Sequence, residues 1–201
     1  MHLTARFPVT RLAIAVTALL AQLPLLAMPS HLIFLGTYTR NGSRGIYAVR
    51  LDDETGALST PSVAAESPNP AWIVLLPDKK FLYAIHESQA QAVGFTIDAA
   101  NAKLSPLPAE KTPDAQPPSH LAVDATGRAL LAANYREGRA EIVPILAGGK
   151  LGVPTIIQHT GTGPNTARQE KSHVHSATLS PEDRKSTRLN SSHVSESRMP
   201  S

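Results

Sequence analysis

The segment PAWIVLLPDKKFLYA at Pro70–Ala84 decides the fold, because its pattern returns 48 residues later as PSHLAVDATGRALLA at Pro118–Ala132. A third copy begins at HVHSATLSPEDR, where His175 falls on the position of His120 and Trp72, an offset of 55 residues from His120. Each copy consists of an apolar segment, a turn and a second apolar segment. This pattern predicts a series of β-hairpins.

A second unit lies between these copies and repeats at nearly the same interval. It reads GIYAVRLDDETGALS from Gly45, VGFTIDAANAKLS from Val93 and EIVPILAGGKLG from Glu141. Four short strands in every 46–55 residues is typical of one blade of a β-propeller, in which each sheet is covered by its neighbours. We therefore predict an all-β chain with a β-propeller fold. A β-sandwich whose hairpins are similar by accident is the alternative.

The number of blades is small for this fold. Propellers typically have about four to eight blades, and residues 28–182 provide only about three. After Pro181 the chain turns polar and Ser-rich, without strand alternation. The string DRKSTRLNSSH in this tail also resembles the translation of a common sequencing adapter. We expect a propeller domain cut short, followed by a non-native disordered tail over residues 183–201; a natural disordered tail is the alternative.

Composition favours one globular unit and argues against a nucleic-acid partner. The chain is 42% hydrophobic but only 4% aromatic, with 17 prolines and 12 glycines. Residues 184–201 contain four basic side chains against the single acid Glu196, which accounts for the whole formal net charge of +3. The rest is formally neutral, so electrostatic support for nucleic-acid binding is lost. The lack of cysteine excludes disulfides, zinc–thiolate sites and a thiol nucleophile.

The N-terminus has the pattern of a secretory signal. Arg6 and Arg11 precede LAIAVTALLAQLPLLA from Leu12 to Ala27, an uncharged run of 16 residues. The run is short for a membrane span, which needs about 20 apolar residues. We expect residues 1–27 to be a signal peptide cleaved near Ala27. The mature protein would then be periplasmic or secreted, without stable membrane association; an uncleaved anchor is the alternative.

Polar residues that interrupt the strand pattern are candidates for a site, because propellers carry their sites on the axial channel and the connecting loops. The densest cluster is GPNTARQEKSHVH from Gly163 to His175. His173 and His175 would share one face of a strand, which suits a divalent metal, although no third ligand is evident. His120 occupies the blade position equivalent to His175, so the two are expected to face one cavity.

Surface roles are the alternative for the charged residues of this cluster. Arg168 is interpreted either as a solvated loop cation or as a binding group for an anion. Glu170 is interpreted either as a surface partner of Arg168 or Lys171, or as a catalytic carboxylate. The concentration of an amide, two cations, a carboxylate and two histidines in 13 residues favours a functional site.

Seven segments together resemble the 6-phosphogluconolactonase family of seven-bladed propellers. In order from about Leu32 to Pro181 they are GTYT, GIYAVRLD with TGAL, NPAW, LYAIHE, PPSHLAVD, ANYREG and GTGPNTARQEKSHVH. The resemblance implies hydrolysis of the ester bond of a sugar lactone in glucose metabolism, typically 6-phosphogluconolactone, without an established metal requirement. A fungal branch with the same fold closes muconate-type lactones. The predicted export is a departure, because the phosphorylated substrate arises in the cytoplasm.

Lactone hydrolysis needs a base that activates water and a donor-rich pocket for the oxyanion. The candidate catalytic residues are Arg168, Glu170, His173 and His175. Glu170 and the two histidines are the candidate bases. The planar guanidinium of Arg168 suits the oxyanion or a substrate carboxylate or phosphate. The candidate substrate-binding residues are His120, Asn134, Tyr135 and Gln169.

The expected partner is a small lactone, and no cofactor, bound metal or nucleic acid is expected. A monomer is expected, and the fragment itself should be inactive. Two other readings remain open. One is a non-catalytic exported propeller that binds a ligand or a protein partner; the other is a sugar dehydrogenase propeller, for which no cofactor signature is visible.

The run from Leu12 to Ala27 generates the first testable prediction. We expect the protein to be exported and trimmed near Ala27, because a charged start followed by a short apolar run is the signal recognised for secretion. Intact-mass measurement of periplasmic material checks this directly. A protein that still starts at Met1 and stays in the cytosol would overturn it.

Overall fold

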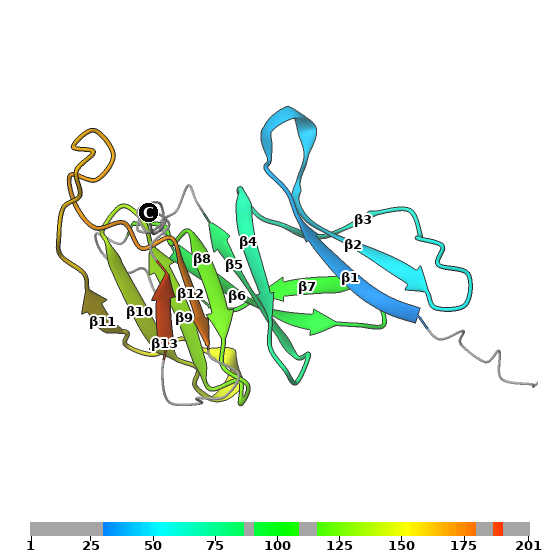
Figure 1. Ribbon diagram of the computed structural model, residues 1–201. Helices are drawn as coiled ribbons and strands as arrows, with labels where there is room; N and C mark the ends of the chain where they lie inside the picture. Colours follow the sequence, from blue (N-terminus) through cyan, green and yellow to red (C-terminus); the bar gives the residue numbers. More distant parts are fainter. Residues whose placement is uncertain (1–29, 87–90, 109–115, 180–186, 191–201) are drawn as a thin grey trace, which may run out of the picture.

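The computed structural model describes residues 30–86, 91–108, 116–179 and 187–190, and strands dominate these parts of the chain (Figure 1). The strands are β1 (Ser30–Gly36), β2 (Gly45–Asp52), β3 (Ser62–Glu66), β4 (Pro70–Leu75), β5 (Phe81–His86), β6 (Gln91–Asp98), β7 (Lys103–Pro106), β8 (His120–Val123), β9 (Ala129–Asn134), β10 (Arg139–Pro144), β11 (Thr155–Gln158), β12 (Ser176–Leu179) and β13 (Thr187–Asn190). Two 3-10 helices, η2 (Arg40–Gly42) and η4 (Ala147–Gly149), join strands.

The strands form antiparallel sheets that succeed one another along the chain. Their orders are β1-β2-β3, β4-β5-β6-β7, β8-β9-β10-β11 and β12-β13. The predicted equivalent segments Ile73–Leu76, Leu121–Val123 and Ala177–Leu179 fall on β4, β8 and β12, apart from Leu76, which follows the end of β4. Each of these strands is the edge strand of a separate sheet. The all-β, blade-by-blade prediction is therefore confirmed.

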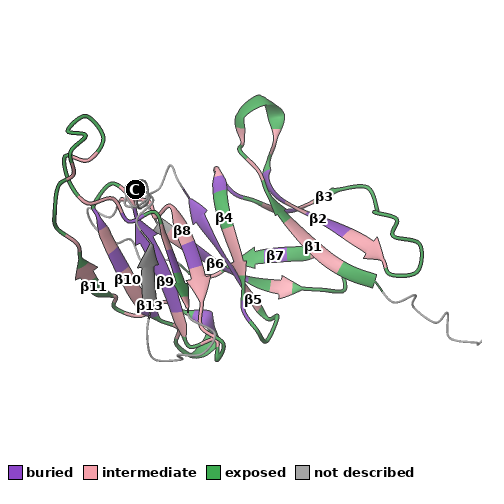
Figure 2. Ribbon diagram, viewed as in Figure 1, coloured by how far each residue is buried: buried purple, intermediate pink, exposed green. Residues whose placement is uncertain are grey.

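The second strand of each four-stranded blade is buried on both faces. Along β5, Leu82 and Ala84 pack into a cluster with residues of β2 and β3. Tyr83 and Ile85 point the other way and pack with residues of β8 and β9. Strand β9 repeats this arrangement, with alternate residues facing the second blade and β12. Burial on both faces explains why FLYAIH and ALLAAN are nearly continuous apolar runs, and why Figure 2 shows these strands largely buried.

Two side chains tie the second blade to the third through hydrogen bonds. The Tyr83 hydroxyl donates to the carbonyl oxygen of Gly149 at 2.7 Å. Burial, with a smaller contribution from Asp78, raises the pKa of Tyr83 to about 12, so the phenol keeps its proton. The indole nitrogen of Trp72 donates to the carbonyl oxygen of Leu121 at 2.9 Å. These bonds fix the spacing of adjacent blades.

Strand β1 occupies the place of β5 and β9 in its blade but is not covered as they are. It pairs with β2 as β5 pairs with β6 and β9 with β10. Within the described residues, no strand pairs with its other edge. None of the β1 side chains is buried, and Leu35 is exposed. Leu32 and Phe34 pack, partly buried, against the core of the first two blades, but the run LIFL lacks the cover on both faces that the equivalent runs receive in the next two blades.

The tail differs from the expectation at four residues. Thr187–Asn190 form β13, which pairs antiparallel with β12 from Ser176↔Asn190 to Leu179↔Thr187. An antiparallel ladder is made by backbone groups, so a polar segment can pair with a free strand edge whatever its side chains. The rest of residues 183–201 lies outside the described residues, as does the predicted signal peptide. Among the described residues, no helix is long and apolar enough to cross a membrane.

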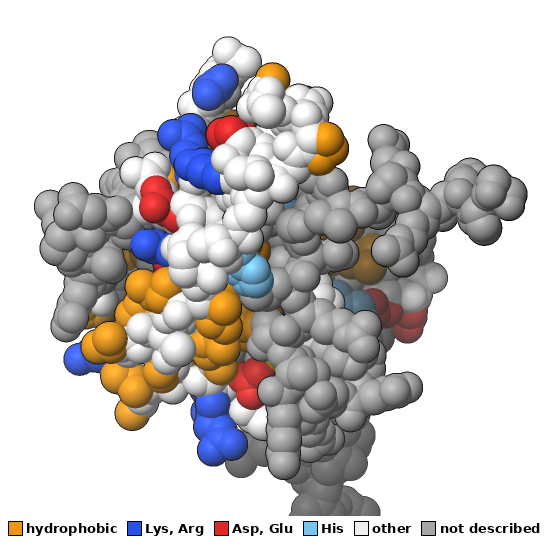
Figure 3. Space-filling model, turned by 60° about the vertical axis from the view of Figure 1, so that its left-hand side comes forward, with side chains coloured by type: hydrophobic (Ala, Val, Ile, Leu, Met, Phe, Trp, Pro, Cys, Tyr) orange, Lys and Arg blue, Asp and Glu red, His pale blue; other side chains and the backbone are white. Residues whose placement is uncertain are grey.

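The uncovered surfaces generate a prediction for residues 28–182 expressed alone. Large apolar side chains are exposed at Leu58 and Val153, and Figure 3, which brings the β11 side forward, shows hydrophobic side chains gathered on its lower part. With β1 also uncovered, we expect this segment to aggregate or to melt without cooperativity. Analytical ultracentrifugation and thermal melting measure this. A soluble monomer with a sharp melting transition would show that the three blades are self-sufficient.

Candidate active site

Aromatic and ionisable side chains from two blades surround Tyr135, in the turn that follows β9. The Tyr135 ring stacks on His173, with ring centroids 4.4 Å apart and planes at 18°. The ring of His175 meets Tyr135 edge-on, at 5.8 Å and 90°. Both histidines lie in the segment before β12, so this contact brings the third blade together with the start of the next one.

The two histidines do not lie on a strand, contrary to the expectation. Strand β12 begins only at Ser176. The Ser119 hydroxyl lies 3.0 Å from the backbone carbonyl of His175, so a side chain rather than a strand partner can satisfy this group. Both rings still contact the same tyrosine. Their proximity therefore comes from Tyr135 and not from strand alternation.

His173 is held between two oxygen acceptors. Its Nδ1 lies 3.0 Å from the carbonyl oxygen of Tyr135, and its Nε2 lies 3.3 Å from Oε1 of Glu170. A carbonyl oxygen only accepts, so Nδ1 carries a proton and donates it. The side chain is only 10% exposed, whereas that of Glu170 is 50% exposed. His173 is thus placed to orient the Glu170 carboxylate.

Backbone and side-chain groups together favour the ionised form of Glu170. The pKa of Glu170 is lowered, first by its own backbone N–H and then by the hydrogen bond and charge of His173. Its carboxylate therefore holds its negative charge at neutral pH. A half-exposed, oriented carboxylate is a group that can accept a proton from water.

His120 joins the cluster from the first position of β8. Its ring lies 4.4 Å from that of Trp72, tilted by 46°. The pKa of His120 is lowered by burial and, to a smaller extent, by the neighbouring His175. Its Nδ1 is buried and has no hydrogen-bond partner in the described part of the chain. His120 is therefore a neutral group that interacts electrostatically with His175.

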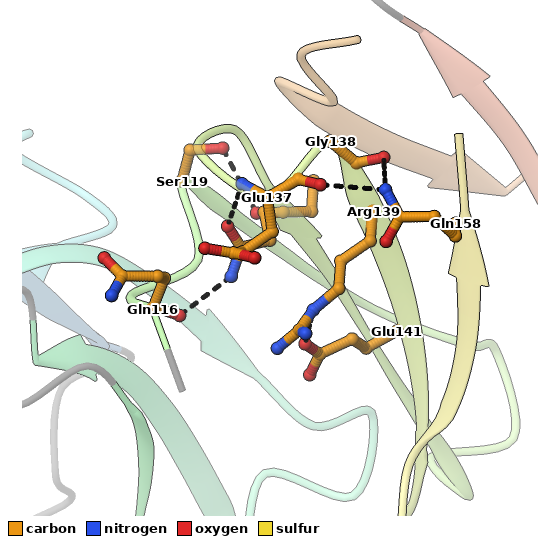
Figure 4. Close-up of polar contacts among 9 residues, drawn as sticks. Gln116, Ser119, Glu137, Gly138, Arg139, Glu141 and Gln158 are labelled. Carbon is orange, nitrogen blue, oxygen red and sulfur yellow. Dashed lines mark hydrogen bonds and ion pairs between the residues drawn. The ribbon is translucent and has the colours of Figure 1, made fainter. Parts of the chain in front are cut away.

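The turn that carries Tyr135 is fixed by its neighbours. Gly138 has a φ of 63°, and a Cβ there would collide with the backbone oxygen of Ser172, so only glycine fits this approach. The amide nitrogen of Gln158 donates to the carbonyl oxygens of Glu137 and Gly138, at 2.9 and 3.2 Å (Figure 4). Glycine packing and backbone hydrogen bonds thus hold the turn against the histidine segment.

Asn134 has a different environment from the one expected. It is 1% exposed, and its Nδ2 donates to the carbonyl oxygen of Gln116 at 2.8 Å (Figure 4). Its Oδ1 accepts from the backbone N–H of Glu137 at 3.1 Å. One buried amide therefore links the segment that leads to His120 with the turn that carries Tyr135. Its contacts are those of a positioning residue.

Gln169 and Arg168 precede Glu170 in the same loop. The Oε1 of Gln169 accepts from the backbone N–H of Asn165 at 3.0 Å, and its backbone oxygen accepts from Gly163 at 2.8 Å, so Gln169 closes its own loop. Arg168 is exposed, and its side chain forms no ion pair with the described residues. The structure thus groups Glu170, His173 and His175 with Tyr135 and His120.

Sequence reasoning missed two contributors to this region. Trp72 was noted only as the position equivalent to His120, yet its ring contacts that of His120. Ser119, within the PPSH motif, bridges β9 and the histidine segment through its hydroxyl group. In both cases the equivalence of blade positions was the available signal. No group of three or more potential metal ligands is clustered among residues 30–86, 91–108, 116–179 and 187–190.

Residues 32–187 match the sequence profile of the protein family described as "Lactonase, 7-bladed beta-propeller". The chain belongs to this lactonase family. It is 36% identical over 158 residues to a 6-phosphogluconolactonase of Bacillus subtilis, covering 77% of this chain and 45% of the relative. The crystal structure of a protein from Bacteroides uniformis gives a TM-score of 0.67 at 34% identity. The match covers 76% of this chain and 45% of that one. The structure of the periplasmic gluconolactonase PpgL of Pseudomonas aeruginosa gives a TM-score of 0.63 at 26% identity. The match covers 77% of this chain and 45% of PpgL.

This member of the lactonase family spans about half the length of the curated relatives it matches. The family resemblance predicted from the seven motifs is confirmed. The cluster around Tyr135 lies within the matched residues. The shared part of the chain thus includes the third blade and the loop from Gly163 to His175.

The double role of Asn134 generates a stability prediction. Asn134→Ala removes two part-buried hydrogen bonds of a buried side chain, so the free energy of unfolding should fall by about 1–3 kcal/mol. Asn101→Ala is the matched control, because Asn101 is exposed and bonds only within its own turn; its effect should be about 0.5 kcal/mol or less. Denaturant unfolding of a complete ring that contains residues 28–182 measures both. Equal losses of unfolding free energy in the two variants would mean that the two Asn134 hydrogen bonds do not stabilise the fold.

Proposed function

We propose that the complete propeller containing these blades hydrolyses the ester bond of a sugar lactone at the cluster around Tyr135. The observation that carries this proposal is the meeting of His173 and His175 at Tyr135, with Glu170 paired to His173. An ionised carboxylate and an exposed imidazole supply proton acceptors at one place. Membership of the lactonase family, and relatives named 6-phosphogluconolactonase, support the reaction class.

His175 is the base that we favour. Its ring is exposed, whereas His173 already faces acceptors on both sides. In the first step His175 takes a proton from water as the water oxygen bonds to the lactone carbonyl carbon, forming a tetrahedral oxyanion. Arg168, with its uncommitted guanidinium, stabilises this oxyanion or the substrate's own anionic group.

In the second step the ring C–O bond breaks and the carbonyl re-forms. The departing alkoxide takes the proton held by His175, which restores the neutral imidazole. The product is the open-chain hydroxy acid, so one water is consumed and no oxidant or reductant is needed. Glu170 supplies a negative charge beside His173, and His173 keeps this carboxylate in place.

The substrate that we favour is an unphosphorylated gluconolactone in the periplasm. The predicted signal peptide supports this compartment, where a phosphorylated intermediate of sugar metabolism is not expected. The similarity to a protein named periplasmic gluconolactonase supports the same assignment. On a complete ring, a higher kcat/KM for glucono-δ-lactone than for its 6-phosphate is the expected result. The 201-residue chain alone should be inactive, because an axial site needs groups from the whole ring.

Substitutions in a complete seven-bladed ring that contains residues 28–182 test the proposed roles. Arg168→Ala and His175→Ala should each lower kcat/KM for gluconolactone by about 100-fold or more, because each removes a group that acts on the transition state. Stopped-flow measurement of proton release follows the reaction. Unchanged melting temperatures are required, so that the loss reports chemistry.

Matched controls lie far from the cluster. Arg128→Ala removes an exposed arginine at the opposite end of β9, and His31→Ala removes an exposed histidine of β1. Both should leave kcat/KM within about twofold, as surface changes usually do. A complete ring that binds gluconolactone but never hydrolyses it would replace the lactonase proposal with a non-catalytic binding function.

A further inference from the structure

Trp72 continues the candidate site onto a second blade. Its ring contacts that of His120, and the charge of His175 contributes to the lowered pKa of His120. These three residues occupy equivalent positions at the start of the edge strands of successive blades. Trp72 and His120 are therefore in ring contact between β4 and β8, and His175 lies in the segment before β12.

A β-bulge gives Trp72 a backbone position that His120 does not share. In β4 the register shifts between Pro70↔His86 and Ile73↔Ala84, so that one extra residue is inserted at Ala71–Trp72. In β8 the pairing is regular from His120↔Ala133 onward. Bulges re-aim side chains and are enriched beside functional sites.

The start of this bulge is anchored from the first blade. Asn69 adopts a left-handed conformation with a φ of 44°, which asparagine tolerates better than most residues. Its Oδ1 accepts hydrogen bonds from the backbone N–H and the hydroxyl of Thr39, at 3.0 and 2.9 Å. The GTYT motif, which the proposed chemistry does not use, thereby holds the backbone that presents Trp72.

The indole is immobilised without being buried. Its N–H is committed to the carbonyl oxygen of Leu121 at 2.9 Å, yet Trp72 remains 42% exposed. Burying a large aromatic side chain normally contributes to stability, and this contribution is only partly realised here. A rigid, partly exposed ring beside a polar cluster is the usual form of a ligand-binding surface.

We propose that Trp72 determines specificity by stacking its indole face against the C–H face of the substrate's sugar ring, with His120 beside it. This inference rests on the proposed function, because it adds a binding residue to the same site. Stacking acts on the bound ring and not on the reacting carbonyl. It therefore lowers KM and leaves kcat nearly unchanged.

The test compares variants of the complete ring in kinetics and in binding. Trp72→Ala should raise KM for glucono-δ-lactone, and the Kd for its stable product gluconate, by about tenfold, with kcat within about twofold. Trp72→Phe keeps an aromatic face and should restore most of the affinity. Leu75→Ala is the matched control, because Leu75 lies on the same strand and is 43% exposed; it should change neither constant.

Calorimetry with gluconate separates this inference from the proposed function. If the ring hydrolyses no lactone but Trp72→Ala still weakens gluconate binding, the stacking role stands and the lactonase proposal fails. If Trp72→Ala leaves both KM and Kd unchanged, the stacking role is wrong. Equal effects of Trp72→Ala and Trp72→Phe, with a lowered melting temperature, would also overturn it, because they would mark Trp72 as a packing residue.

Discussion

The burial of the second strand of each four-stranded blade between two other sheets is the constraint on which the rest of this structure depends. Strand β5 sends alternate side chains into the first and third blades, and β9 does the same for the second blade and β12. No sheet can bury both faces of such a strand alone, so blades must succeed one another. The polar cluster sits where this packing brings the third blade against the next segment of the chain.

Buried polar side chains hold the segments that carry the candidate site residues in fixed positions. Asn134, at the end of β9, bonds to the segment before β8 and to the turn after β9. His86 lies at the equivalent end of β5, where its Nε2 is 2.6 Å from the hydroxyl of Ser67, in the segment before β4. In both blades, the last residue of the second strand therefore bonds to the segment that leads into the edge strand. The rings of Trp72 and His120 meet at these two fixed entries.

The sequence alone was sufficient to predict the repeating fold. Strands buried on both faces need apolar runs such as FLYAIH and ALLAAN, and these recur at a constant interval. The sequence also predicted Glu170, His173 and His175 as candidate site residues, because polar and ionisable side chains are dense in their loop. It did not reveal that Asn134 is a backbone clamp or that Gln169 closes its own loop. Those roles depend on which backbone groups face each amide, and residue type does not determine this. Trp72 was missed because a bulge, which periodicity does not reveal, sets its position.

A crystal structure of the complete ring with bound gluconate is the most direct test of the central claim, that successive blades build one lactone site around Tyr135. The ligand should lie against His120 and His175, with its carboxylate within hydrogen-bond distance of Arg168. Gluconate bound elsewhere in the ring, with the Tyr135 cluster free of ligand, would contradict the claim.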